Sequence, residues 1–155
     1  MDDVPADAPY VWIALLVVSA AVAGAVLAHP TAPPPDAERV AMAVDRVAAT
    51  GHVASSTVPL DADRIRLGST RIALESAGGR AYATVRYGPV APVRDGDLAR
   101  VLRGADPADV FASPATFRHA LDRAESRRGT WRPAPTELSV RRVQYGEVAG
   151  VLVGR

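Results

Sequence analysis

Residues 10–28 read YVWIALLVVSAAVAGAVLA, a run of 19 residues without a charged side chain. A helix rises about 1.5 Å per residue, so a run of this length comes close to the roughly 30 Å thickness of the hydrocarbon core of a bilayer. A helix also satisfies its own backbone polar groups, for which lipid offers no partners. The sequence therefore predicts a transmembrane helix over residues 10–28.

A cleaved secretory signal is the alternative explanation of this run. Signals begin with basic residues, whereas the tail over residues 1–9 contains Asp2, Asp3 and Asp7 and neither Lys nor Arg. The apolar run is also longer than the roughly 7–15 residues that are typical of a signal. The prediction is a retained helix, and cleavage at the alanine-rich stretch near Ala28 is the alternative that the sequence leaves open.

Five residues of this run are predicted to anchor the helix in the membrane. Tyr10 and Trp12 suit the interface between lipid and water, where amphipathic aromatic rings gather. Ala20, Gly24 and Ala28 are spaced four apart, which lets two helices approach closely. The span therefore permits a homo-oligomer, although a stretch so rich in alanine also produces this spacing by chance.

The side of the membrane on which the rest of the chain lies is left open. Basic residues favour the cytoplasmic side, and the 18 residues after the span contain only Arg39 and Arg46. A domain of this size also crosses a membrane largely regardless of its charges. The sequence predicts a protein of the cell membrane with either orientation.

Residues 29–35 contain four prolines and predict a stiff, extended spacer, and residues 36–155 then show the patterns of helices and strands. Asp36 is placed to cap a helix that ends near Thr50, because apolar residues recur on one face until Gly51. Segments rich in Val, Ile, Thr and Tyr between turn residues predict an antiparallel meander, then a helical region and a final pair of strands. The expected ranges are 52–60, 64–67, 70–75 and 80–87 for the meander, 98–103, 106–111 and 114–128 for helices, and 137–145 and 148–153 for the last strands.

These elements predict an α+β domain over residues 36–155, with an antiparallel sheet and helices packed on one face. Ile65 and Leu67 alternate with arginines, which gives their strand one buried face and one wet face. The apolar final strand, residues 148–153, fits either an open sheet edge or a central strand buried on both sides. The sequence leaves both interpretations open.

The sequence contains no catalytic or metal-binding motif. Cysteine is absent, which excludes disulfides and thiolate metal sites. His29, His52 and His119 are far apart and have no glutamate at the spacing of zinc peptidases. The acidic pairs in residues 61–63 and 95–97 lack the further ligands of a calcium loop and are typical of turns. We therefore expect no enzymatic activity, no cofactor and no bound metal.

All 18 basic residues are arginines, and outside the tail they exceed the acidic residues by four. Guanidinium groups bind phosphate in a bidentate manner, so the clusters at residues 127–132 and 141–142 are candidates for contacts with nucleic acid or lipid headgroups. Acidic residues are interspersed, however, and no series of aromatic residues accompanies the arginines to stack bases. We therefore expect local ion pairs and no nucleic-acid partner.

Six short motifs are spread over nearly the whole chain: Tyr10-Val11-Trp12, Pro33-Pro34-Pro35-Asp36, Tyr87-Gly88-Pro89, Asp106-Pro107-Ala108-Asp109-Val110-Phe111, Trp131-Arg132-Pro133 and Leu138-Ser139-Val140-Arg141-Arg142-Val143. With these motifs the chain resembles an uncharacterised family of haloarchaeal single-span membrane proteins. Members of that family are encoded near components that resemble archaeal type IV pilus or secretion machinery, which implies an accessory or structural role. The resemblance carries over no catalytic residue.

Together these features predict a non-enzymatic single-pass membrane protein whose domain makes protein contacts at the membrane surface. The expected partners are the lipid bilayer and a membrane or pilus-like protein. The alternative is a membrane-tethered sensor or ligand-binding domain. An assembly component should show an unpaired sheet edge or an exposed apolar patch, whereas a ligand binder should show an enclosed pocket with convergent polar groups.

Overall fold

The computed structural model describes residues 8–27 and 32–155 of the chain. The chain divides between Thr31 and Ala32 into two compact units. Several predicted features lie outside the described residues: residues 1–7 of the acidic tail, Ala28, and residues 29–31 of the spacer, which include His29.

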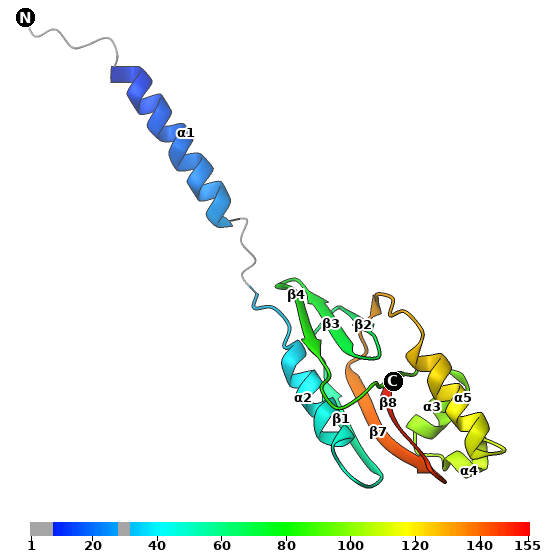
Figure 1. Ribbon diagram of the computed structural model, residues 1–155. Coiled ribbons are helices and arrows are strands. Elements are labelled where there is room, and N and C mark those ends of the chain that lie inside the picture. Colours follow the sequence, from blue (N-terminus) through cyan, green and yellow to red (C-terminus); the bar gives the residue numbers. More distant parts are fainter. Residues whose placement is uncertain (1–7, 28–31) are drawn as a thin grey trace, which may run out of the picture. The chain divides into compact units, whose positions relative to one another are not determined.

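Helix α1 (Ala8–Leu27) covers nearly all of the predicted membrane span (Figure 1). Its described side chains, those of residues 11–22, are all exposed, and Trp12 and Ala20 are among them. Tyr10 and Gly24 also lie in this helix. Among residues 8–27 and 32–155, however, no helix combines the length and the apolar character that a bilayer crossing requires. The membrane span therefore stays a prediction.

Helix α2 (Ala37–Ala48) begins where the sequence predicts it. The carboxylate of Asp36 accepts a hydrogen bond from the backbone N–H of Arg39 at 2.9 Å and so caps the helix. Val40, Val44 and Val47 are buried on one face of the helix. This amphipathic pattern needs an apolar partner surface, which two sheets supply.

The end of the predicted proline-rich spacer, residues 32–35, is part of the second unit. Pro35 is buried. A side chain at Gly78, in the turn between two strands, would overlap the backbone carbonyl group of Pro33. Residues 33–35 are therefore packed on the domain.

The first sheet has the strand order β1-β7-β8-β5. Strand β1 (Ala54–Pro59) pairs antiparallel with β7 (Glu137–Tyr145), β7 pairs antiparallel with β8 (Val148–Gly154), and β5 (Ala91–Pro92) runs parallel to β8. The prediction that residues 52–60 begin the meander is therefore wrong, because β1 pairs with a strand from the C-terminal part of the chain. Strand β8 is a central strand, so its interpretation as an open edge is also wrong.

The second sheet has the strand order β4-β3-β2-β6. Strands β2 (Arg64–Leu67), β3 (Arg71–Ser76) and β4 (Gly79–Thr84) form the rest of the predicted meander, with short turns between antiparallel neighbours. The two residues of β6 (Arg132–Pro133) extend the sheet beyond β2. The local turn signals therefore predict these three strands correctly.

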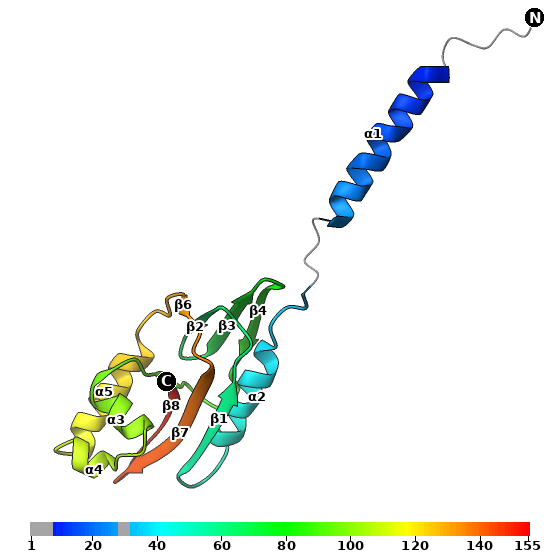
Figure 2. The same cartoon turned by 180° about the vertical axis from the view of Figure 1, so that it is seen from behind.

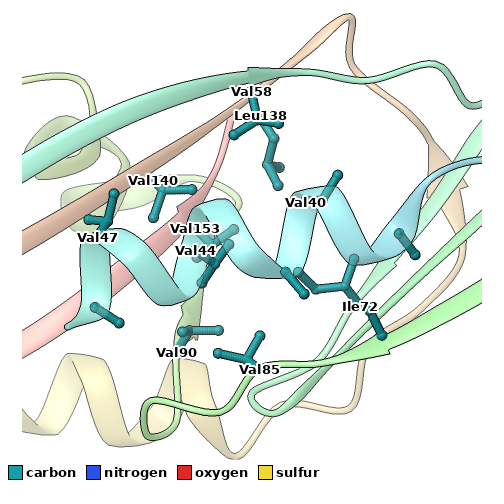
Figure 3. Close-up of a cluster of buried hydrophobic side chains, with 14 of the residues drawn as sticks. Val40, Val44, Val47, Val58, Ile72, Val85, Val90, Leu138, Val140 and Val153 are labelled. Carbon is teal, nitrogen blue, oxygen red and sulfur yellow. The ribbon is translucent and has the colours of Figure 1, made fainter.

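Helix α2 lies between the two sheets and contributes to one apolar core with both of them. Figure 3 shows the valines of α2 surrounded by side chains from each sheet and from the segment that follows β4. These side chains are Val58, Leu138, Val140 and Val153 from the first sheet, Ile72 from the second sheet, and Val85 and Val90 from the following segment.

Helices α3 (Gly96–Leu102), α4 (Pro107–Val110) and α5 (Pro114–Glu125) cover the opposite face of the first sheet (Figure 2). Successive residues of a strand point to opposite faces. In β8, Val151 and Val153 therefore join the core around α2, while Leu152 joins a second core with Phe117 and Leu121 of α5. The α+β class is confirmed, but the expectation of one sheet with helices on one face is wrong.

Candidate functional site

Each sheet has two edge strands, and β4 differs from the other three. Strands β1, β5 and β6 contain Pro59, Pro92 and Pro133, and β5 and β6 are only two residues long. Proline has no N–H to offer to a further strand, and an edge of two residues gives a further strand few backbone groups to pair with. Strand β4 has six residues and no proline. It is the one edge in residues 32–155 that is long enough and free of proline.

The register of β3 and β4 shows which backbone groups this edge offers. Val85, directly after β4, donates its N–H to the carbonyl oxygen of Thr70 at 2.9 Å. Because the hydrogen bonds of an antiparallel pair engage alternate residues, the even-numbered residues of β4 direct their N–H and C=O groups away from β3. These residues are Arg80, Tyr82 and Thr84, and no hydrogen bond of these outward groups is found within the described part of the chain.

A groove of about 460 Å³ follows this edge and is closed on its other side by α2. Met42 of α2 and Tyr82 of β4 line it with exposed apolar surface, at 58% and 56% exposure. Glu38 of α2 faces it with negative charge, and Arg71 and Arg86 line it with positive charge. The groove therefore combines apolar contacts, charges of both signs and a row of free backbone groups.

Asp45 fixes the end of the groove. Its Oδ1 atom accepts hydrogen bonds from the backbone N–H groups of Arg86 at 2.8 Å and Tyr87 at 3.1 Å. These bonds hold the segment after β4 against α2, so the distance between the two walls is set by the fold. Asp45 thus links the two walls of the groove directly.

The outer face of the second sheet carries charged and aromatic side chains next to this edge. Glu75 forms ion pairs with Arg64, at 3.3 Å, and with Arg80. The guanidinium groups of Arg64 and Arg80 lie 5.7 and 5.5 Å from the ring centre of Trp131, within the range of cation–π contacts. The hydrogen bond from Arg80, assisted by the charges of both arginines, lowers the pKa of Glu75 from its usual value. This face therefore carries a connected cluster of three charged side chains and one aromatic ring.

The residues that the sequence suggested for chemistry are dispersed. In the part of the chain that the structure describes, no three His, Asp or Glu side chains gather as a metal site would require. His52 follows α2, whereas His119 lies on α5. Residues 61–63 connect β1 to β2, as the turn interpretation predicts. Asp95 instead precedes α3, and Gly96 and Asp97 are the first residues of that helix, so the turn interpretation is wrong there.

The arginine clusters have different roles. Arg141 donates to the backbone oxygens of Val101 and Ala105 at the end of α3, and Arg142 donates to the oxygen of Ala48 at the end of α2. Both side chains satisfy helix C-termini, where a positive charge is favourable. The expectation of local ion pairs is wrong for these two residues, because their partners are carbonyl groups 36 to 94 residues away along the chain.

The groove beside β4 is a site that the sequence analysis missed. The signal was present in the distribution of proline, which occurs in three edge strands and is absent from GRAYAT at residues 79–84. That signal becomes readable only when the strand order is known. The same holds for Trp131, because the sequence does not place this ring near Arg64 and Arg80.

The fold and the groove define a small α+β domain of two sheets with a single open edge, joined to an apolar helix. The chain belongs to the DUF7283 family, a family of unknown function, whose model matches residues 3–143. Neither a curated protein nor a solved structure shows detectable similarity to this chain.

Proposed function

We propose that this chain is a single-pass membrane protein whose domain binds an extended segment of a partner protein along β4. The observation that carries the proposal is the free edge of Arg80, Tyr82 and Thr84 beside a groove that α2 closes. Addition of a strand to such an edge supplies affinity through backbone hydrogen bonds, and neighbouring side chains supply specificity. The role is structural or accessory and involves no catalysis.

The lining of the groove indicates the chemistry of the partner segment. A strand paired with β4 places alternate side chains on opposite faces of the sheet. On the side of α2 it meets Met42 and Glu38, which suit an apolar and a basic residue. Near the end of the groove it meets Arg71 and Arg86, which suit an acidic residue. We therefore expect an extended segment that carries both charges around an apolar centre.

The docking mode is tested by a proline at an outward position of β4. Thr84→Pro removes one outward N–H and leaves the bonds between β3 and β4 in place, because residue 84 faces away from β3. Thr57→Pro is the matched control: Leu60 donates to Thr136 at 2.9 Å, so Thr57 faces outward on the edge β1. A photoreactive benzoylphenylalanine in place of Met42, in the groove, traps the partner in native membranes.

Mass spectrometry then measures the yield of the photoadduct between residue 42 and the partner, which reports docking. Loss of one backbone hydrogen bond and insertion of the proline ring should reduce the yield of the partner adduct about tenfold in Thr84→Pro. Thr57→Pro should keep it within about twofold of the unsubstituted chain. Equal yields in both proline variants, or recovery of the uncrosslinked monomer alone, would contradict docking at β4.

The proposed membrane anchor rests on the apolar helix. Residues 10–28 have no charged side chain, and the large apolar side chains among residues 11–22 are all more than half exposed. An exposed apolar surface of this kind is stabilised when lipid or protein covers it. Lipid is the covering that we propose, with Tyr10 and Trp12 at the interface.

Extraction of membranes with alkaline carbonate tests the anchor. The unsubstituted chain should stay in the membrane pellet, whereas Leu16→Arg with Val17→Arg should release it, because each arginine at the centre of a span costs about 2.5–3.5 kcal/mol on the insertion scale. The same two arginines at Val53 and Tyr87, both exposed in the domain, serve as the control and should leave the chain in the pellet. Release of the unsubstituted chain, or an N-terminus beyond residue 28, would contradict the anchor.

The assembly that we propose for the docked partner is a pilus-like or secretion assembly, on the strength of the motifs that resemble haloarchaeal single-span proteins. Sidedness is decided by protease added to intact cells. Digestion of the domain places β4 outside the cell, where such an assembly would be built. Protection of the domain, with digestion after lysis, places the partner in the cytoplasm and contradicts an external pilus-like assembly.

A further inference from the structure

A second groove lies on the domain between residues of the two sheets, and it shares no lining residue with the groove beside β4. It has a volume of about 410 Å³ and is lined by residues of β2, β6, β7 and the ends of β5 and β8. Ile65 and Leu138 are buried and form its floor together with the half-buried Leu67. Arg94, Arg132 and Arg155 also line it, and of these Arg94 and Arg155 are exposed and Arg132 is half-buried. Apolar carbon thus lies at the bottom of this groove and positive charge at its mouth.

The positive charge at the mouth is not neutralised by nearby acids. The ion pairs found within residues 8–27 and 32–155 involve neither Arg94 nor Arg132 nor their neighbour Arg127. Burial lowers the pKa of Arg94, and the positive charges of Arg132 and Arg127 lower it further, while Asp95 opposes them. Positive charges that line one groove raise the local concentration of anions.

The rim is also ordered in a way that suits an anion. The Nη2 atom of Arg94 donates to the hydroxyl oxygen of Thr130 at 3.2 Å, and Thr130 lies two residues before Arg132, the first residue of β6. This bond ties the loop after β5 to the loop before β6. The two guanidinium groups therefore stand on backbone segments that the fold holds together.

We propose that this groove binds an amphiphilic phosphate, with the phosphate at Arg94 and Arg132 and a short hydrocarbon chain on Ile65, Leu67 and Leu138. Guanidinium groups bind phosphate oxygens in a bidentate manner, and a phosphate dianion matches two arginines better than a carboxylate does. A volume of about 410 Å³ falls within the range of small-molecule sites. The inference is independent of docking at β4, because the two grooves share no lining residue.

Two soluble phosphate monoesters separate the amphiphile from a free phosphate. Hexyl phosphate offers the phosphate and an apolar chain, whereas glycerol 3-phosphate offers the same phosphate with a polar chain. Calorimetric titration of the full chain in a neutral detergent, with the detergent alone as the blank, gives both dissociation constants. We expect hexyl phosphate to bind about tenfold more tightly, since burial of its chain on the apolar floor adds to the phosphate contacts.

Paired substitutions test the two arginines. Arg94→Gln with Arg132→Gln should weaken binding of hexyl phosphate by about tenfold or more. Arg103→Gln with Arg118→Gln removes the same charge from exposed positions elsewhere and should leave the dissociation constant within about twofold. Arg94→Lys with Arg132→Lys keeps the charge, loses the bidentate contacts and should give an intermediate constant.

Three results would overturn the proposal. Equal binding of the two monoesters would show that the apolar floor contributes nothing. Equal loss in both glutamine pairs would show that net charge alone attracts the phosphate. Full affinity in the lysine pair together with loss in the glutamine pair would show that charge rather than bidentate geometry holds it. Circular dichroism of each variant confirms that the folded chain is what binds.

Discussion

Glu75 links the two arginines on the charged face of the second sheet. It accepts from Arg80 and Arg64, and these two arginines also flank the ring of Trp131. Its lowered pKa means that the carboxylate favours the folded chain over the unfolded chain. This stabilisation is complete at a pH above about 4.5 and is lost as the pH falls through the lower pKa of the folded state.

Glu75→Gln should therefore flatten the acid side of the stability profile. Urea unfolding followed by circular dichroism at pH 6 and pH 3 gives the loss of unfolding free energy for each chain. The unsubstituted chain should lose more than Glu75→Gln does, whereas Glu147→Gln, at an exposed position in a turn, should lose as much as the unsubstituted chain. Equal losses in all three chains would show that Glu75 does not couple to folding.

Residue-level predictions succeeded where the partner is close in the sequence. Asp36 caps its helix as expected, because its carboxylate accepts from a backbone N–H only three residues away. The roles of Arg141 and Arg142 could not be predicted, because their acceptor carbonyl groups lie 36 to 94 residues away. The separation of the two partners along the chain, rather than their residue types, therefore decided which hydrogen bonds could be predicted from the sequence.

At the scale of elements, α5 approaches β8 so closely that only glycine fits between them. A side-chain carbon at Gly150 would lie 2.7 Å from a methyl group of Leu121, which is shorter than any normal contact. Helix α5 is held there by Phe117 and Leu121 in the second core. The small residue in an otherwise valine-rich strand is thus explained by the helix that crosses it.

Gly150→Ala should destabilise the fold by about 1–3 kcal/mol, because the added methyl group must displace Leu121 in a packed core. Gly51→Ala is the control, since a side chain there would meet nothing within 4 Å. Urea unfolding at neutral pH measures both. A free energy of unfolding for Gly150→Ala equal to that of Gly51→Ala would show that α5 is not seated on β8 as described.

The pairing of elements was predicted in part. Strands β2, β3 and β4 follow from short turn signals, which act locally. Strand β1 was placed in the same meander, yet it pairs with β7, so that Ala54 lies opposite Arg142. Sequence periodicity identifies a strand but not its neighbour, because both sheets offer an apolar face to α2. The division of the strands into two sheets around α2 could therefore not be predicted from the sequence.

At the scale of the whole molecule, the two proposals depend on how the sheets end. Three edges carry proline and one does not, which leaves β4 open to a partner. The groove that contains Arg94 and Arg132 is lined by β2 and β6 of the second sheet and by β7 and β8 of the first sheet. The sequence predicted protein contacts, and it left residues 148–153 as either an open edge or a central strand; the structure places them in the interior of a sheet.

Hydrogen exchange at single amides of β4 tests docking at this edge. In the purified full chain, the outward N–H groups of Tyr82 and Thr84 should exchange fast, while those of Ala81 and Ala83, bonded to β3, should exchange slowly. In native membranes with the partner bound, the amides of Tyr82 and Thr84 should exchange at least about tenfold more slowly, because an added strand protects them. Unchanged fast exchange at these two amides, in membranes where the photoadduct at position 42 forms, would contradict strand addition at β4.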